Sequence, residues 1–530
     1  MLEYYFYGAG LRLGQSIVYA SLWIVIGLLI AAVFRCMLGP EKVRTLFGDG
    51  TRRGILTGWL IGMLLPVCSL GVIPIVRELQ RSGVKGGTII AFALTAPLFN
   101  PMSVLYGLTL SDPIAIICFS LCALVIVSFL GLLWDRFFAT PPIEQPEPLP
   151  TPGIKRIAAV GHNMIREITG ASGAYILFGI LCSVLIAVSF EKGHLQGEVE
   201  RDNWKAPITV AAIALPIYST PLLAMSQIGG MFQHGNSIGA AFSLLILGAG
   251  TNMGLVAWFI RSFGWVRTLS FLIMLAVTTI GLAYAISEPL YPKGIEAAGH
   301  SHAFDVYNHP FHYGQTDLSH VALNRMKEFW KAHELGVTWV LGGLVFVGLV
   351  LPRFRFWEKF ESWIQSPSDE KVGGGIDILI PDWVLGATVV AGLVAASVAG
   401  AYLFYPSPDE LLPDMFNVNT ECVLESKNEQ WESAEKWIGF ADDLSRRLEV
   451  GVFLRNGSVD PFKSAKAKTY REKLDLVKQA VEQRDAERID ELAMDLSNAY
   501  TRMSKAFKEE EIIPIEQLMK KRRRSPLPQK

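Results

Sequence analysis

The sequence predicts an all-α polytopic membrane protein. We expect two inverted repeats, each with a re-entrant broken-helix hairpin, then two additional transmembrane helices and a C-terminal soluble helical bundle. The 530 residues are 51% hydrophobic and only 18% charged. Apolar runs of about 20 residues are long enough to cross a bilayer as helices. The formal net charge is −1, so the global charge indicates no nucleic-acid partner.

Eight charge-poor segments are long enough to be crossing helices. They are residues 15–37, 86–110, 112–135, 171–190, 237–260, 268–288, 335–351 and 382–404. The first has no basic region before it and no small-residue cleavage site after it. This pattern is typical of a retained helix rather than of a signal peptide.

Two further segments, 54–82 and 206–235, are apolar but interrupted. The first is broken by Pro66-Val67-Cys68-Ser69 and the second by Pro216-Ile217-Tyr218-Ser219-Thr220-Pro221. Proline and small polar residues release backbone groups that lipid cannot satisfy, so such breaks face protein or a water-filled cavity. Paired breaks at matching places in two halves indicate the binding site of a secondary transporter.

The two halves also match beyond these breaks. The first half continues to Pro97 and Asn100, and the second half continues to Asn252. In both halves a glycine, Gly83 or Gly235, precedes the asparagine by the same interval. This equal spacing predicts that the two halves contain copies of one structural element.

Basic residues on both sides of the first broken segment predict that it is re-entrant. Arg52 and Arg53 precede it, and Arg77 and Arg81 follow it, so the positive-inside rule places both ends in the cytoplasm. With two re-entrant hairpins, every short basic loop falls in the cytoplasm. Each half then has three crossings and one hairpin, and this odd number inverts the second half relative to the first.

These assignments divide the chain into six parts. Residues 1–138 form the first repeat, 139–165 a Pro-rich cytoplasmic linker, 166–290 the second repeat, 291–334 an extracytoplasmic His-rich loop, 335–405 two additional transmembrane helices with an interfacial segment, and 406–530 an extracytoplasmic helical domain with a basic tail. Helical periodicity in the last part covers 421–450, 463–483 and 485–508.

The broken segments resemble those of a known family. Pro66-Val67-Cys68-Ser69-x-Gly71-Val72-Ile73-Pro74, the Arg-rich turn after it and Ala96-Pro97-x-x-Asn100-Pro101 are similar to the predicted permease family that includes trivalent organoarsenical exporters. The resemblance covers about residues 50–135 and, more weakly, 165–290. It implies a multi-pass permease of a bacterial inner membrane that moves a small, soft solute outward.

The chain departs from this family at one position. Many relatives carry a second cysteine two residues after the first, where this chain has Leu70. Two nearby thiolates hold a soft metalloid better than one. The departure therefore bears on the substrate and not on the architecture.

Six residues at the breaks are candidates for a solute site: Cys68, Ser69, Asn100, Ser219, Thr220 and Asn252. The Cys68 thiol either coordinates a soft solute such as As(III) or packs as a small buried hydrophobe. An amide inside an apolar span needs partners, so the two asparagines either join helices or bind solute. Their equivalent positions favour the lining of a cavity.

Several chemistries have no sequence support. None of the predicted spans contains an acidic or basic residue away from its ends, which argues against proton antiport through a carboxylate at the membrane centre. No Gly-x4-Gly-Lys-Ser/Thr motif for ATP occurs. The spans also lack a nucleophile–base pattern, so we expect no enzymatic activity.

The loop after the second repeat is rich in histidine. His300, His302, Asp305, His309 and His312 follow one another at intervals of two to four residues. Imidazole and carboxylate groups suit Zn²⁺, Cu²⁺ or Ni²⁺, although the intervals match no fixed zinc motif. The loop is therefore either a metal site or a polar loop that happens to contain histidine.

Two functions fit these patterns. The first is an inner-membrane permease that exports a small soft solute, a metalloid or transition-metal species, by alternating access between inverted repeats. The alternative is a membrane-embedded sensor or assembly factor that uses the external His-rich loop and the C-terminal helical domain. Expected partners are the solute, membrane lipids and an extracytoplasmic protein that binds the C-terminal domain.

Overall fold

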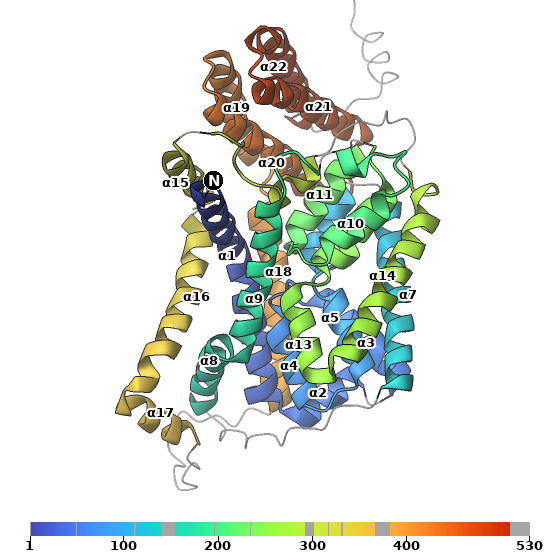
Figure 1. Cartoon of the computed structure of the whole chain (residues 1–530), viewed down its shortest axis with the longest axis vertical. Coiled ribbons are helices and arrows are strands. Elements are labelled where there is room, and N and C mark those ends of the chain that lie inside the picture. The colour runs from blue at the N-terminus through green and yellow to red at the C-terminus, as the bar shows by residue number, and fades with distance from the viewer. Residues whose placement is uncertain are drawn as a thin grey trace, which may run out of the picture. The chain divides into compact units, whose positions relative to one another are not determined.

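The computed structural model describes residues 2–48, 50–110, 113–138, 154–195, 197–233, 235–291, 302–315, 317–329, 332–365 and 382–508. Helices dominate these residues, and no strand occurs among them (Figure 1). The chain divides into two compact units, 1–399 and 400–530. The prediction of an all-α protein with several apolar helices is confirmed.

The first part of unit 1 runs from α1 to α7. Its helices are α1 (Leu2–Val33), α2 (Pro40–Phe47), α3 (Thr51–Leu64), α4 (Val72–Arg81), α5 (Gly86–Thr95), α6 (Pro101–Leu110) and α7 (Pro113–Phe137). A π-helical turn, Phe34–Leu38, continues α1. The predicted break of the first interrupted segment is confirmed, because non-helical residues 65–71 separate α3 from α4.

The second part of unit 1 repeats this order. Its helices are α8 (Ile154–Thr169), α9 (Ala171–Ser189), α10 (Ala206–Ala214), α11 (Pro221–Gln233), α12 (Ile238–Ser243), α13 (Met253–Phe263) and α14 (Trp265–Ser287), with a π-helical turn, Leu244–Ala249, after α12. Residues 215–220 separate α10 from α11, so the second predicted break is also confirmed. Pro221 is well suited to the first turn of α11, because its missing N–H has no helical partner there.

The last three helices of each part begin at a constant spacing. Helices α5, α6 and α7 begin at Gly86, Pro101 and Pro113. Helices α12, α13 and α14 begin at Ile238, Met253 and Trp265, so one and the same interval separates each helix start from its counterpart.

Two glycines follow the same spacing. Gly83 and Gly235 stand at equivalent places before α5 and α12, and both have positive φ values, 73° and 61°. Only glycine adopts this backbone conformation without steric cost. In Figure 1, α2 and α4 lie toward one end of unit 1, and α10 and α11 lie toward the other.

Among the described residues, five helical segments are long and apolar enough to cross a membrane. They are Glu3–Leu38, Pro113–Phe137, Ala171–Ser189, Trp265–Ser287 and Leu335–Arg353. The pair Ile238–Ala249 and Met253–Phe263 would be a sixth, bent by 59°. The predicted span 86–110 is two short helices, because the chain leaves the helix between Thr95 and Pro101.

The remainder of unit 1 contains shorter elements. They are a 3₁₀ helix (His302–Tyr307), α15 (Leu318–Phe329), α16 (Ala332–Val350), α17 (Arg355–Gln365) and α18 (Asp382–Phe404), which crosses the division between the units. The aromatic rings of Phe356, Phe360 and Trp363 stack along α17. This helix is the one predicted to lie in the membrane interface.

The described part of unit 2 contains the polar-surfaced helices α19 (Pro408–Lys427), α20 (Trp431–Asn456), α21 (Pro461–Gln483) and α22 (Ala486–Lys508). Its core includes Leu448, Tyr470, Leu474 and Met503. The last two predicted helical segments are confirmed. The predicted helical segment 421–450 is helical except at a turn between α19 and α20, where Glu429 has a φ of 58°.

Candidate functional site

The link between α3 and α4 forms the tip of the first hairpin and is buried. Cys68 and Ser69 are both inaccessible to solvent. The backbone N–H of Gly71 donates a hydrogen bond to the Cys68 sulfur over 3.3 Å, which holds the thiol inside the turn. The Tyr218 hydroxyl, from the second hairpin, lies beside this sulfur without the geometry of a hydrogen bond. The structure therefore brings the tips of the two hairpins together at Cys68.

Asn100 and Asn252 occupy equivalent positions at the starts of two helices. The Oδ1 atom of Asn100 accepts a hydrogen bond from the backbone N–H of Ser103, at the start of α6. The Oδ1 atom of Asn252 accepts one from the N–H of Leu255, at the start of α13. Both distances are 2.9 Å. Asparagine is a favoured N-cap residue because its oxygen satisfies an N–H that the helix leaves free.

The nitrogen atoms of the same two side chains take no part in this capping. Asn100 and Asn252 are fully buried, and neither Nδ2 atom has a hydrogen-bond partner among the described residues. The Ser69 and Tyr218 hydroxyls likewise have no hydrogen-bond partner within the described part of the chain. Buried polar groups without partners are rare and costly. Four of them lie at the two hairpin tips and the two helix breaks, which makes this region the candidate site.

Glycines let these elements approach closely. A Cβ atom on Gly179, in α9, would lie 2.9 Å from both Asn252 Oδ1 and a Leu70 methyl carbon. The second asparagine therefore lies near the tip of the first hairpin. A Cβ atom on Gly250 would lie 3.3 Å from a Leu98 methyl carbon. This contact brings the residues before Asn100 next to those before Asn252.

Ser219 and Thr220 form the tip of the second hairpin and are also buried. The Thr220 hydroxyl accepts a hydrogen bond from the N–H of Leu223 over 3.2 Å, so it caps α11. The Ser219 hydroxyl donates to the Thr220 carbonyl oxygen over 3.2 Å. Gln227, further along α11, accepts a hydrogen bond from the Tyr307 hydroxyl over 3.3 Å. Neither Gln227 nor Tyr307 is among the site residues predicted from the sequence.

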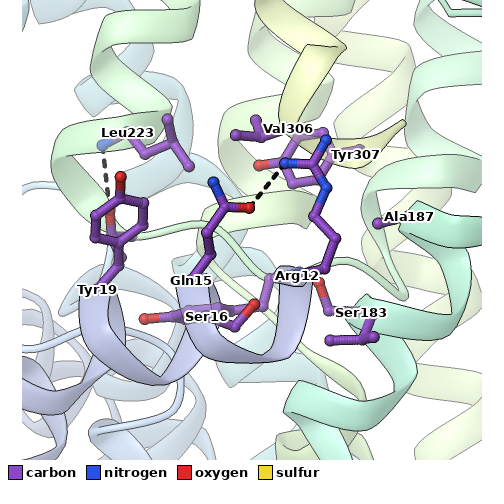
Figure 2. A pocket seen from close by; sticks show the side chains of 12 residues that line it. Arg12, Gln15, Ser16, Tyr19, Ser183, Ala187, Leu223, Val306 and Tyr307 are labelled. Carbon is purple, nitrogen blue, oxygen red and sulfur yellow. Dashed lines mark hydrogen bonds between the residues drawn. The ribbon is translucent and has the colours of Figure 1, made fainter. Parts of the chain in front are cut away.

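A pocket of about 40 Å³ borders the second hairpin tip. Figure 2 shows side chains of α1, including Arg12, Gln15 and Tyr19, on one side of it. Residues of α9, α11 and the 302–307 helix complete the wall. The lining residues are Arg12, Gln15, Ser16, Tyr19, Ser183, Val184, Ala187, Tyr218, Thr220, Leu223, Val306 and Tyr307.

The α1 side of this pocket was not predicted from the sequence. The predicted first span, 15–37, leaves Arg12 outside, whereas the first apolar helical segment of the structure begins at Glu3 and contains Arg12. Carbonyl oxygens of Asn308 and Asp305 accept hydrogen bonds from its guanidinium group there. The signal is present in the sequence: Arg12, Gln15, Ser16 and Tyr19 follow the spacing i, i+3, i+4 and i+7 and so form a polar stripe on one helix face.

A cluster of ion pairs joins the first hairpin to α8 and α9. Arg81 Nη1 donates to one Glu167 oxygen over 2.7 Å, and Arg77 binds the other oxygen. Ser172 donates to the same carboxylate over 2.6 Å. The cluster connects segments about 90 residues apart in sequence. A carboxylate with this many donors is held in a fixed position.

The described histidines of the His-rich loop do not meet. His309 is buried and stacks on the Tyr4 ring, with 3.5 Å between the ring centroids, and His312 is exposed. The carbonyl oxygen of Asp305 accepts a hydrogen bond from Arg12 over 2.8 Å. His300 and the His302 side chain lie outside the described residues. Within the described residues, no group of three or more possible ligands could hold a metal ion, and the predicted metal site stays a prediction.

The chain matches a family of membrane proteins. A family model described as a predicted permease (ArsP_1) matches residues 11–288. The UPF0718 protein YcgR of Bacillus subtilis is 34% identical over 80 residues, which are 15% of this chain and 27% of that protein. A putative two-component membrane permease complex subunit of Streptococcus mutans is 30% identical over 86 residues, which are 16% of this chain and 29% of that protein. No solved structure matches significantly.

The two relatives align over less than a third of their own length, whereas the family match covers more than half of this chain. That match contains both hairpins, both asparagine breaks and most of the pocket lining. It ends at residue 288, next to the end of α14. The chain is a multi-pass membrane protein that belongs to the predicted permease family.

Proposed function

We propose that this chain is a secondary permease that moves a small soft solute, a metalloid or transition-metal species, out of the cell across the inner membrane. The solute binds where the two hairpin tips meet the two asparagine breaks, at Cys68, Ser69, Asn100, Ser219, Thr220 and Asn252. One observation carries the proposal: Asn100 and Asn252 are both buried, and their amide nitrogens lack a partner among the described residues.

A purely structural role explains the side-chain oxygen of each asparagine but not its nitrogen. Capping α6 and α13 requires an oxygen acceptor, which serine or aspartate would also supply. The nitrogen adds nothing to the cap, and burying it without a partner costs about 1–3 kcal/mol. A solute that accepts hydrogen bonds from both nitrogens would remove this cost. The same reasoning applies to the hydroxyl of Ser69.

Alternating access between inverted repeats is the mechanism that we propose for transport. It is supported by the constant spacing between equivalent helix starts in the two parts of unit 1. It is also supported by the position of the two hairpins toward opposite ends of unit 1 (Figure 1). Rocking of one repeat against the other would expose a central site to each side of the membrane in turn.

Serine substitutions separate solute binding from capping. Asn100→Ser and Asn252→Ser keep an oxygen acceptor at the helix start but remove the amide nitrogen, whereas Asn100→Ala removes both. The control is Ser237→Ala, which deletes the N-cap of α12, where the Ser237 hydroxyl accepts from the Ala240 N–H. Cells without their own exporters would be loaded with trivalent arsenicals, copper, zinc, nickel and cobalt. Inductively coupled plasma mass spectrometry then gives the content of each element.

We expect wild-type protein to lower the content of one element. Both serine variants should lose this effect at unchanged protein level, and Ser237→Ala should retain it. Transport by the serine variants at the wild-type rate would show that the asparagines act only as caps. If none of these elements changes in cells with wild-type protein, export of a metalloid or transition-metal species is contradicted.

A second candidate function is a sensor or assembly role that depends on unit 2. It is favoured by the end of the family match at residue 288 and by the separate core of α19 to α22. Deletion of residues 406–530 tests it. A permease should keep residual flux without this unit, whereas a sensor should lose its output completely.

A further inference from the structure

At the two asparagine breaks, the groups without a hydrogen-bond partner among the described residues are N–H donors. Each carboxamide oxygen already accepts a helix N–H, whereas the amide nitrogens lack a partner among the described residues, so Asn100 and Asn252 offer N–H donors to a solute. The Ser69 and Tyr218 hydroxyls can donate or accept. A solute that meets both amides must therefore present acceptor atoms. Metal cations need the opposite arrangement, in which protein oxygens point at the ion.

The pocket beside the second hairpin adds a positive charge. The Arg12 side chain is only 9% exposed. It donates to the Asn308 carbonyl oxygen over 3.1 Å, to the Asp305 carbonyl oxygen over 2.8 Å and to Gln15 Oε1 over 2.9 Å. All three acceptors are neutral. The charges of Arg325 and the Asp305 carboxylate act on Arg12 from further away and with opposite signs.

A buried cation that contacts only neutral groups is costly. Within an apolar helix such a charge usually belongs to a solute pathway. Hydroxyl groups of Ser16, Tyr19 and Ser183 line the same pocket. The pocket also includes Tyr218 and Thr220 of the second hairpin tip, so it adjoins the site at Cys68. A negative charge that entered this pocket would be next to the Arg12 cation and the Tyr218 hydroxyl.

We propose that the pocket between α1, α9, α11 and the 302–307 helix binds a small anion, and that the transported solute is such an anion, with oxygen or sulfur atoms that accept hydrogen bonds. This inference rests on the proposed permease function and narrows its substrate class. A volume of about 40 Å³ holds on the order of three water-sized groups, so the anion has few heavy atoms. The inference favours such an anion over a free transition-metal cation as the solute.

Thermal unfolding of the purified full-length protein in detergent tests the anion site directly. The probes are the sodium salts of sulfate, thiosulfate, selenite and arsenate, compared with the chlorides of zinc and nickel at equal ionic strength. We expect at least one anion to raise Tm saturably by several degrees, because a ligand that binds only the folded state stabilises it. Arg12→Gln should weaken the apparent affinity for that anion by about tenfold to a hundredfold. Arg12→Lys should retain part of it.

Two further variants keep the result interpretable. Arg201→Gln removes one positive charge at a site where Arg201 pairs with the exposed Glu288, so it controls for net charge and should leave the anion response unchanged. Ser16→Val fills the pocket but leaves the hydrogen bonds of Arg12 intact, so it should abolish the response even if Arg12→Gln does not fold. A wild-type protein that no anion stabilises would overturn the inference, as would an unchanged anion response in Ser16→Val.

The inference and the permease proposal can fail separately. If cells export a metal cation or a neutral metalloid and Arg12→Gln exports it normally, the chain is a permease and the anion inference is wrong. If an anion binds in the pocket and cells loaded with that same anion do not lose its central element, the binding site is supported and the permease proposal is wrong.

Discussion

Arg81 and Glu167 form a hydrogen-bonded ion pair of 2.7 Å although 86 residues separate them. Arg77 binds the second oxygen of the same carboxylate. Only 10% of the Glu167 side chain is exposed, so solvent screens the cluster weakly. The first hairpin is thereby fixed to the helix that leads into α9.

Glu167→Gln should destabilise the folded protein. It removes the negative charge that Arg77 and Arg81 share, while Arg81 keeps a contact with Glu78 over 3.4 Å, so the cost should lie below the value of about 3–5 kcal/mol for breaking a fully buried ion pair. We expect a lower Tm for the purified variant. Glu288→Gln is the matched control, because Glu288 pairs with Arg201 over 3.6 Å at an exposed position and should have an effect below about 1 kcal/mol. Equal Tm values for the two variants would contradict this account.

Stability should also depend on pH through Glu167. Burial raises the pKa of Glu167, but the charges of Arg77 and Arg81 outweigh this effect and lower the pKa below its ordinary value. A carboxyl whose pKa is lower in the folded state contributes its full stabilisation above the pKa of the unfolded chain, about 4.3. That contribution is lost as the pH falls through the folded-state pKa.

The measurement is the difference in Tm between wild type and Glu167→Gln from pH 7 to pH 3. We expect a constant difference above about pH 5 that shrinks in more acidic solution. A difference that grows as the solution becomes more acidic would show that the sign of the Glu167 contribution is wrong.

Gly27→Ala should disturb the first hairpin tip. A Cβ atom on Gly27, in α1, would lie 2.0 Å from the carbonyl oxygen of Gly71, so α1 and the tip must separate. Overpacking of this kind costs about 1–3 kcal/mol. Gly14→Ala is the control in the same helix, because a Cβ atom there would meet no atom of the described residues within 4 Å. We expect lower Tm and lower transport for Gly27→Ala alone, and equal behaviour of the two variants would disprove the close contact.

Cys422, in the core of unit 2, should resist alkylation in the folded protein. It is inaccessible to solvent, and burial raises its pKa to about 12. Since the thiolate is the reactive form, iodoacetamide at pH 8 should modify Cys422 only after the protein is unfolded in guanidinium chloride. Peptide mass spectrometry of the labelled full-length chain distinguishes Cys422 from the other cysteines. Rapid labelling without denaturant would show that unit 2 opens readily.

The positions of the helix breaks could be predicted because local chemistry determines them. Proline removes a backbone donor, and serine, threonine and asparagine bind free backbone groups near their own position. Asn100 and Asn252 thus indicate a helix start from the sequence alone. The same holds for Gly83 and Gly235, whose positive φ values few other residues tolerate.

Contacts between distant segments could not be predicted in this way. The neighbours of Glu167 include Arg77 and Arg81, and no local pattern relates them. Arg12 was missed because a charge near the end of an apolar segment is normally placed in a loop. Its burial depends on carbonyl oxygens of Asp305 and Asn308, which lie far later in the chain.

Each of the two asparagines begins a helix with one end of a planar amide and leaves the other end free. The amide cannot rotate its nitrogen without removing its oxygen from the helix start, so each N–H group has a fixed direction relative to its helix axis. Any tilt of α6 or α13 must then change the distance between the two nitrogens. A solute held by both nitrogens would fix the distance between the two helices. The distance between spin labels on α6 and α13 should therefore change when the solute binds.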